Sequence, residues 1–120
     1  MGWKGVEKRR FVRAQFPCRI IIHTPSEHVV SSHTENIGAG GIRVIIQENL
    51  DISTIVDLDI YLGDEPIVCK ARIVWTVEKK NPLSGESLMY DTGLEFYQIE
   101  DKDRELIKNL VNVLVSGDNG

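Results

Sequence analysis

Apolar and polar residues alternate along much of the chain between residues 17 and 97, with the period of two that is typical of strands with one buried face. In residues 56–62 every second position is apolar: Val56, Leu58, Ile60 and Leu62. Residues 67–77 alternate in the same way, with an apolar set of Ile67, Cys69, Ala71, Ile73, Trp75 and Val77. We therefore expect two strands joined by a turn at residues 63–66, the second one long and bent in its middle, with the apolar set of each strand on one face.

Four further segments have the composition of strands, namely residues 18–24, 28–35, 41–46 and 90–96. Turn residues separate them, including Pro25-Ser26 and the stretch from Asn81 to Gly85. About six short strands with turns at intervals of roughly ten residues predict an all-β domain built as a barrel or a sandwich. We place this β domain at residues 16–98.

The end of the chain changes period. Apolar residues follow the spacing of one stripe on a helix: Leu106, Ile107, Leu110, Val111 and Leu114. Asp101 and Asp103 stand in the expected first turn, where the helix dipole favours negative charge, and Gly117 is placed to end the helix. We predict a helix over residues 101–116 that packs on a mouth or side of the β domain.

Composition supports one folded domain over residues 1–120, because 42% of the residues are hydrophobic and 27% are charged. We expect a cytoplasmic protein without membrane insertion, since no long apolar run and no apolar leader are present. Cys18 and Cys69 are expected to be reduced and buried. His23, His28 and His33 recur every five residues, which is not a metal-ligand spacing, so neither a metal nor a cofactor is expected.

The charges are distributed unevenly. Fourteen basic residues against eighteen acidic ones give a net charge of -4, which argues against binding of extended nucleic acid. The first fifteen residues nevertheless carry Lys4, Lys8, Arg9, Arg10 and Arg13 against Glu7 alone. We interpret residues 1–15 as a flexible basic arm whose arginines match phosphate oxygens or the O6/N7 edge of guanine. The alternative is a solubilising tail.

A glycine cluster follows the second expected strand, in the segment from Asn36 to Ile42. Three glycines in four positions, Gly38, Gly40 and Gly41, indicate a turn that needs positive φ angles or a close backbone approach. Asn36 is able to bond its own turn or the edge of a ligand base. The alternative is a tight corner between strands. No catalytic motif accompanies these features, so we expect a protein that is not an enzyme.

Together the two segments resemble the motifs of the PilZ domain family. Residues 9–13 look like its RxxxR motif, and residues 36–42 look like its second motif. Residues 71–75 and 92–96, followed by the helix, are similar to its later strands and closing segment. The resemblance implies a six-stranded antiparallel β-barrel with a C-terminal α-helix packed against it, and binding of the bacterial second messenger cyclic di-GMP (c-di-GMP).

The resemblance also implies roles for individual residues. Arg9 and Arg13 would hold guanine edges and phosphates, Asn36 would bond a guanine edge, and Gly41 would let the backbone turn close beside the base. Lys8 and Arg10 would add positive charge. Trp75 would offer an aromatic face to a guanine, or else belong to the core with its alternating neighbours.

The chain departs from the family pattern at Gly38, where a serine is usual, and at Asn36, where Asp is commoner. The missing hydroxyl removes a hydrogen bond of about 0.5–1.5 kcal/mol. The leading hypothesis is a c-di-GMP receptor that orders its arginine arm on the ligand and signals to an unidentified protein partner. The alternative is a degenerate PilZ-like domain that binds no nucleotide and acts as a protein-interaction module. A barrel that binds RNA or single-stranded DNA through the arm is a third hypothesis, opposed by the acidic net charge.

Overall fold

The computed structural model describes residues 13–117. Seven strands and one helix follow one another along this part of the chain: β1 (Arg13–Ala14), β2 (Arg19–His23), β3 (Val29–Gly38), β4 (Gly41–Ile46), β5 (Ile55–Tyr61), β6 (Ile67–Lys80), β7 (Ser87–Gln98) and α2 (Asp101–Gly117). The strands and the helix expected from the hydrophobic pattern are all present. The short strand β1 is an addition, and it lies at the end of the segment expected as a flexible arm.

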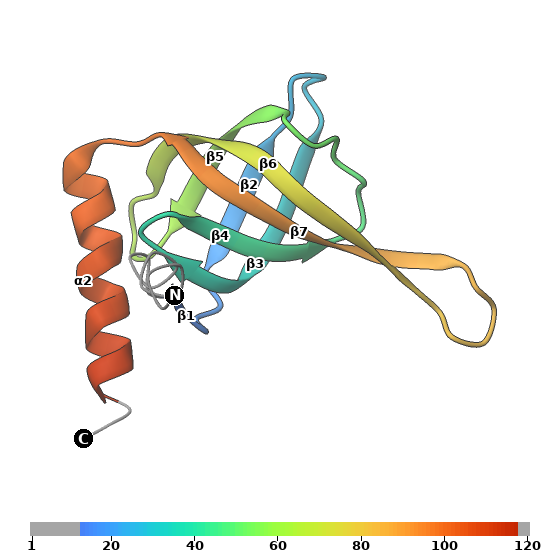
Figure 1. Ribbon diagram of the computed structural model, residues 1–120. Coiled ribbons are helices and arrows are strands. Elements are labelled where there is room, and N and C mark those ends of the chain that lie inside the picture. The colour runs from blue at the N-terminus through green and yellow to red at the C-terminus, as the bar shows by residue number, and fades with distance from the viewer. Residues whose placement is uncertain (1–12, 118–120) are drawn as a thin grey trace, which may run out of the picture.

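Six of the strands form a closed antiparallel barrel (Figure 1). Their order is β3-β2-β5-β6-β7-β4, and β4 pairs again with β3 to close the ring, while β1 adds to the other side of β3 near its end. Closure leaves no long unpaired edge around the ring and buries one face of every strand. The antiparallel six-stranded barrel with a C-terminal helix is therefore confirmed.

The barrel interior is filled by branched aliphatic side chains from the alternating positions. The fully buried ones include Ile20, Ile22, Ile37, Ile42, Val44, Val56, Leu58, Ile60 and Ile73. Burial of such side chains stabilises the fold by about 1.5–3 kcal/mol each. Both cysteines, Cys18 and Cys69, are buried and free, as expected.

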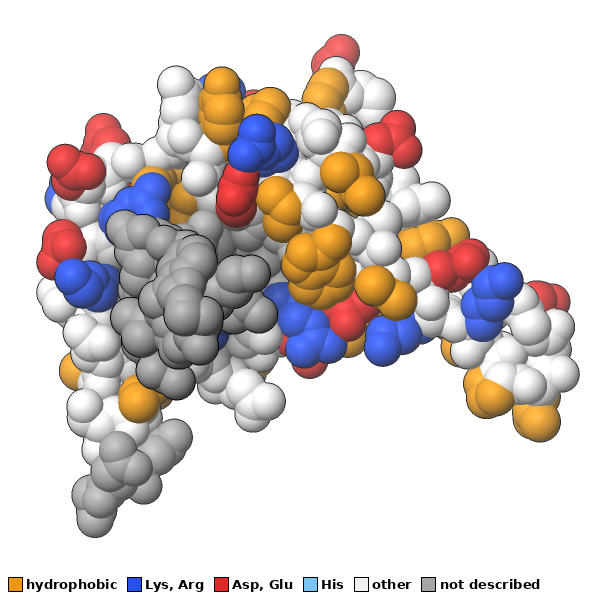
Figure 2. All heavy atoms as spheres, in the orientation of Figure 1, with side chains coloured by type: hydrophobic (Ala, Val, Ile, Leu, Met, Phe, Trp, Pro, Cys, Tyr) orange, Lys and Arg blue, Asp and Glu red, His pale blue; other side chains and the backbone are white. Residues whose placement is uncertain are grey.

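The alternation in β6 does not continue to the end of the strand. Ile73 is fully buried, whereas Trp75 and Val77 are 38% and 51% exposed. The pairing register between β6 and β7 shifts between Ile73 and Trp75, and farther along, beyond the last pair of β7 with β4 at Tyr90, the two strands leave the barrel as a hairpin that projects from the body of the molecule (Figure 1 and Figure 2). The core alternative for Trp75, in a set with Val77, is therefore wrong: the extra residue at this irregularity turns both side chains to the outer face, while Thr76, opposite the buried Thr92, takes the inward position.

Helix α2 stands against the barrel at the end where β1 and the connection from β3 to β4 lie (Figure 1). Ile107 and Val111 are buried and join the core cluster, and Asp101 and Asp103 occupy the first turn. Leu106, expected on the buried stripe, is 52% exposed. The helix therefore covers this end of the barrel with the part of the stripe that includes Ile107 and Val111. No helix within residues 13–117 is long and apolar enough to cross a membrane.

Candidate functional site

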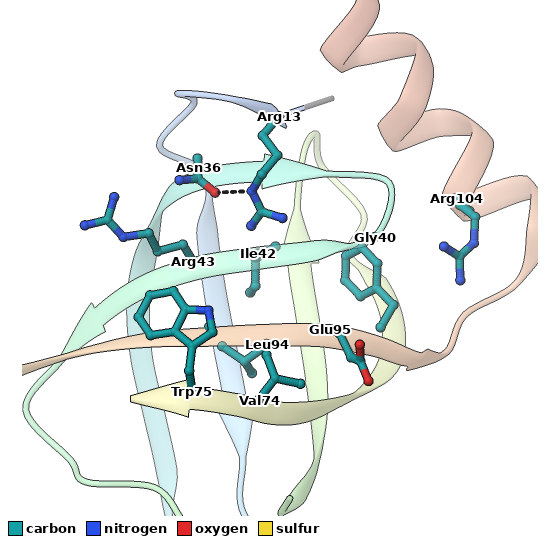
Figure 3. Close-up of a pocket in the computed structure, with 12 residues that line it drawn as sticks. Arg13, Asn36, Gly40, Ile42, Arg43, Val74, Trp75, Leu94, Glu95 and Arg104 are labelled. Carbon is teal, nitrogen blue, oxygen red and sulfur yellow. Dashed lines mark hydrogen bonds between the residues drawn. The ribbon is translucent and has the colours of Figure 1, made fainter. Parts of the chain in front are cut away.

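A pocket of about 850 Å³ lies on the side of the barrel where β1, the β3–β4 connection and the root of the hairpin meet (Figure 3). It is lined by residues from β1, β3, the β3–β4 connection, β4, β6, β7 and α2: Arg13, Asn36, Gly40, Ile42, Arg43, Val74, Trp75, Gly93, Leu94, Glu95, Phe96 and Arg104. Three predicted site residues, Arg13, Asn36 and Trp75, are among them. A site of this size suits a small molecule.

The two motifs of the sequence meet at one hydrogen bond. Nε of Arg13 donates to Oδ1 of Asn36 at 2.7 Å, and both side chains face the pocket (Figure 3). The contact is possible because β1 pairs with the end of β3, with Arg13 opposite Gly38. Burial and the neighbouring Arg43 lower the pKa of Arg13. A guanidinium that is partly desolvated and lies near a second cation favours binding of an anion or of a hydrogen-bond acceptor.

The glycine cluster forms the connection from β3 to β4. Gly38 and Gly41 are opposite each other, joined by Ala39 and Gly40, and the N–H of Phe96 donates to the carbonyl oxygen of Gly40 at 2.9 Å. Within residues 13–117 the glycine with a positive φ is Gly85, so of the two alternatives expected for the cluster the positive φ angle does not apply. The other part, a close backbone approach, is confirmed at Gly41.

The close approach at Gly41 is made by a neighbouring strand. A Cβ atom on Gly41 would lie 2.0 Å from the carbonyl oxygen of Leu94 and 2.9 Å from Cα of Glu95, both in β7. Gly41 therefore allows β4 and β7 to pack closely beside the β3–β4 connection. Gly41 itself is not one of the residues that line the pocket, whereas its neighbours Gly40 and Ile42 are.

Trp75 covers the glycine opposite it. It pairs with Gly93 across β6 and β7, and a Cβ atom on Gly93 would lie 2.1 Å from Nε1 of the indole. The indole thus rests on the bare backbone of β7 and remains 38% exposed at the pocket (Figure 3). An exposed, supported aromatic ring is a surface on which a base is able to stack.

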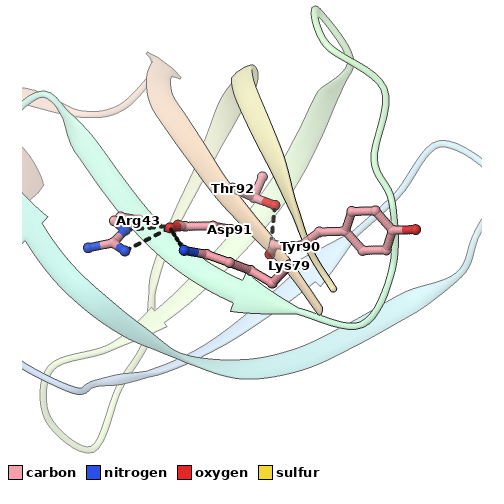
Figure 4. Close-up of polar contacts among 5 residues, drawn as sticks. All are labelled: Arg43, Lys79, Tyr90, Asp91 and Thr92. Atoms are coloured by element: carbon pink, nitrogen blue, oxygen red, sulfur yellow. Dashed lines mark hydrogen bonds and ion pairs between the residues drawn. The ribbon is translucent and has the colours of Figure 1, made fainter. Parts of the chain in front are cut away.

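Two arginines of the pocket were not among the predicted site residues. Arg104, on α2, donates from Nη1 to the carbonyl oxygen of Ala39 at 2.7 Å and so ties the helix to the β3–β4 connection. Arg43, on β4, forms a bidentate pair with Asp91 (Figure 4). Arg43 had one sequence signal, its outward position in the expected strand 41–46, whereas nothing local indicated that Arg104 would reach the glycine cluster.

Glu95 is the carboxylate in the pocket lining, and it forms an ion pair with Arg72. The three lining arginines therefore make the pocket positive although the whole chain is acidic. Lys8, Arg9 and Arg10, the remaining predicted binding residues, lie outside the described residues. Within residues 13–117 no group of three His, Cys, Asp or Glu side chains is arranged to hold a metal ion.

Solved structures with a similar fold include the PilZ domain of YcgR from Escherichia coli with c-di-GMP, at a TM-score of 0.70 and 11% identity, covering 92% of this chain and 94% of that chain. The inhibitor of motility MotI/DgrA from Bacillus subtilis has a TM-score of 0.71 and 22% identity, covering 86% of this chain and 49% of that chain. The complex of MrkH from K. pneumonia with c-di-GMP has a TM-score of 0.70 and 14% identity, covering 92% of this chain and 54% of that chain.

At these identities the likeness shows the fold alone, and the chain spans about half the length of MotI and of MrkH. No curated protein matches the chain. The family model described as PilZ domain matches residues 7–112, a range that includes both motifs and most of α2. The chain belongs to the PilZ domain family.

Proposed function

We propose that this chain is a c-di-GMP receptor that passes the signal to a protein partner and catalyses no reaction. The observation that carries the proposal is the contact of Arg13 with Asn36, twenty-three residues apart, inside a positive pocket that also exposes Trp75. The solved PilZ domain of YcgR and the MrkH complex, which share this fold, hold c-di-GMP.

The groups in the pocket suit the chemistry of this ligand. Guanidinium forks bind phosphate oxygens or the O6/N7 edge of guanine, and a hydrogen bond to a charged group contributes about 1.5–3 kcal/mol. Stacking on an aromatic side chain contributes about 1–3 kcal/mol per base. Arg13 and Trp75 supply both kinds of contact. Arg9, in the same motif, is proposed to act with Arg13 on the bound ligand, and Lys8 and Arg10 are proposed to add charge.

Calorimetric titration with c-di-GMP at near-physiological salt tests the proposal. We expect saturable binding by the unmodified chain and a loss of well over tenfold in Arg9→Ala and in Arg13→Ala. The matched control is Arg19→Ala, because the guanidinium of Arg19 lies over the ring of Tyr61, 5.3 Å from its centroid, outside the pocket. This control should bind within twofold of the unmodified chain.

Two results would count against the receptor function. A loss of affinity below twofold in both arginine variants would show that the arginine motif does not bind the ligand. A flat titration, with the same melting temperature with and without ligand, would favour the alternative of a protein-interaction module. In that case Gly38→Ser, which restores the usual hydroxyl of the second motif, tests whether one hydrogen bond separates the chain from binding.

A further inference from the structure

A row of four residues runs across four neighbouring strands of the barrel. Asn36 on β3 is opposite Arg43 on β4, Arg43 is opposite Gly93 on β7, and Gly93 is opposite Trp75 on β6. All four line the pocket. Opposed residues of paired strands point to the same face of a sheet. Since Gly93 has no side chain, Arg43 and Trp75 are neighbours across it at the rim of the pocket, and the guanidinium of Arg43 points away from Arg13 (Figure 3).

Asp91 determines how the guanidinium of Arg43 is held. Nε of Arg43 donates to Oδ1 of Asp91 at 2.8 Å, and Nη2 donates to Oδ2 at 2.7 Å (Figure 4). The carboxylate is buried, with a side chain 8% exposed, whereas the side chain of Arg43 is 36% exposed. Of the five N–H donors of the guanidinium, this pair uses one on Nε and one on Nη2. The parallel pair on Nη1 and Nη2 has no partner among the described residues.

Arg43 is one of two cations beside the buried carboxylate of Asp91, so neutralising Asp91 does not by itself account for the exposed guanidinium of Arg43 at the pocket. A second cation, Nζ of Lys79, lies 3.9 Å from Oδ2 of Asp91 (Figure 4). Arg43 also lies close enough to lower the pKa of Arg13 by repulsion, after the larger effect of burial. Two guanidinium groups that repel each other across one pocket are stabilised together by a ligand with acceptor groups.

We propose that Arg43 is a further ligand-binding residue of this pocket, that its free N–H pair binds the O6/N7 edge of a guanine stacked on Trp75, and that Asp91 is a positioning residue for it. The inference rests on the proposed function. The bidentate fit of an arginine to O6 and N7 is the geometry by which proteins distinguish guanine from adenine. Arg43 would therefore determine base specificity at one guanine, separately from the arginine motif.

The test is a titration of four forms of the full chain with c-di-GMP and with its 7-deaza analogue, in which N7 is replaced by carbon. The forms are the unmodified chain, Arg43→Ala/Asp91→Ala, Arg43→Lys and the control Lys70→Ala/Asp57→Ala. The first double variant removes both charges of the pair, so that no buried carboxylate is left without a partner. The control removes a different ion pair, 2.7 Å long, between β5 and β6 and outside the pocket.

We expect Arg43→Ala/Asp91→Ala to bind c-di-GMP at least tenfold more weakly than the control. Arg43→Lys keeps the charge but lacks the fork of N–H donors, so it should bind c-di-GMP at least fivefold more weakly than the unmodified chain. Because it keeps a positive charge beside Asp91, it retains the fold and tests the inference if the double variant is too unstable to measure. Loss of N7 should weaken binding to the unmodified chain at least fivefold more than binding to either Arg43 variant, because the contact is already absent in the variants.

Each other outcome has a definite meaning. If the unmodified chain binds c-di-GMP and both Arg43 variants bind within twofold of it, Arg43 serves only to neutralise Asp91 and this inference fails alone. If the variants bind weakly but the N7 penalty is the same in all forms, Arg43 does not contact the guanine edge and the inference fails. If the unmodified chain binds no c-di-GMP, the proposed function fails together with it.

Discussion

The substitution Gly41→Ala tests whether the close packing of β4 on β7 requires a glycine at this position. The new Cβ atom would lie 2.0 Å from the carbonyl oxygen of Leu94 and 2.9 Å from Cα of Glu95. An ordinary contact between carbon and a carbonyl oxygen is about 3.3 Å, so β4 and β7 would have to separate by about 1.3 Å. The neighbouring atoms are backbone in a paired strand and cannot rotate away.

The expected cost follows from these contacts. Overpacking of this kind costs about 1–3 kcal/mol. The separation also weakens the adjoining hydrogen bond from the N–H of Phe96 to the carbonyl oxygen of Gly40, 2.9 Å long, which contributes about 0.5–1.5 kcal/mol. We therefore expect Gly41→Ala to lower the free energy of unfolding by about 3 kcal/mol and the melting temperature by roughly 10 °C.

Urea unfolding followed by far-ultraviolet circular dichroism measures this change, with the slope against urea expected to stay constant. The matched control is Gly63→Ala, since a Cβ atom on Gly63 would have no heavy atom within 4 Å. Its unfolding free energy should stay within about 0.5 kcal/mol of that of the unmodified chain. If Gly41→Ala proves no less stable than the Gly63 control, the close packing of β4 on β7 is refuted.

Three further predictions concern other parts of the structure. Gly93→Ala should push the indole of Trp75 off β7, because the new Cβ atom would lie 2.1 Å from Nε1. In a Trp3→Phe background, where Trp75 is the remaining tryptophan, the fluorescence emission maximum should shift to the red, and an unchanged spectrum would contradict the contact. Burial raises the pKa of the Cys69 thiol to about 12, so a thiol reagent at pH 8 should modify it only as urea unfolds the chain, and rapid modification without urea would be the opposite result. The hydrogen-bonded ion pair with Arg43 lowers the pKa of Asp91 below the usual 3.8. The Asp91 carboxylate therefore stabilises the fold above that pH, and this stabilisation is lost as the pH falls through the lower pKa of the folded state. The urea midpoint of Asp91→Asn should accordingly fall less steeply below about pH 4 than that of the unmodified chain, and parallel curves would show that the pair has no such effect.

The local pattern predicted the elements well and failed where the environment of a strand changed along its length. The alternation from Ile67 to Ile73 correctly placed those side chains in the core, because both walls of the barrel enclose this part of β6. The same alternation gave Trp75, together with Val77, a core position as one of two alternatives, yet both are exposed. A period of two tells which residues share a face only while the strand is regular, and it does not tell where one extra residue turns the following side chains to the other face, as between Ile73 and Trp75.

The candidate site shows the same division. The RxxxR segment and the Asn36–Gly41 segment were recognisable as motifs, and the structure joins them through Arg13 and Asn36. Arg43 lies at the pocket because its strand register places it opposite Asn36 and Gly93, and Arg104 lies there because α2 packs against the barrel. Neither register nor docking has a local signal, because each depends on residues far away in the chain.

The sequence by itself determined the kinds of element, their order, most of the buried positions and the family. These properties follow from periods of two and of 3.6, from turn residues and from short motifs, all of which act over a few neighbouring residues. The tertiary structure alone decided that Gly41 faces the backbone of β7, that Trp75 rests on Gly93 at an open surface, and that Asp91 holds Arg43 at the pocket. These contacts arise from strand register and barrel closure, which are set by the packing of all six strands together.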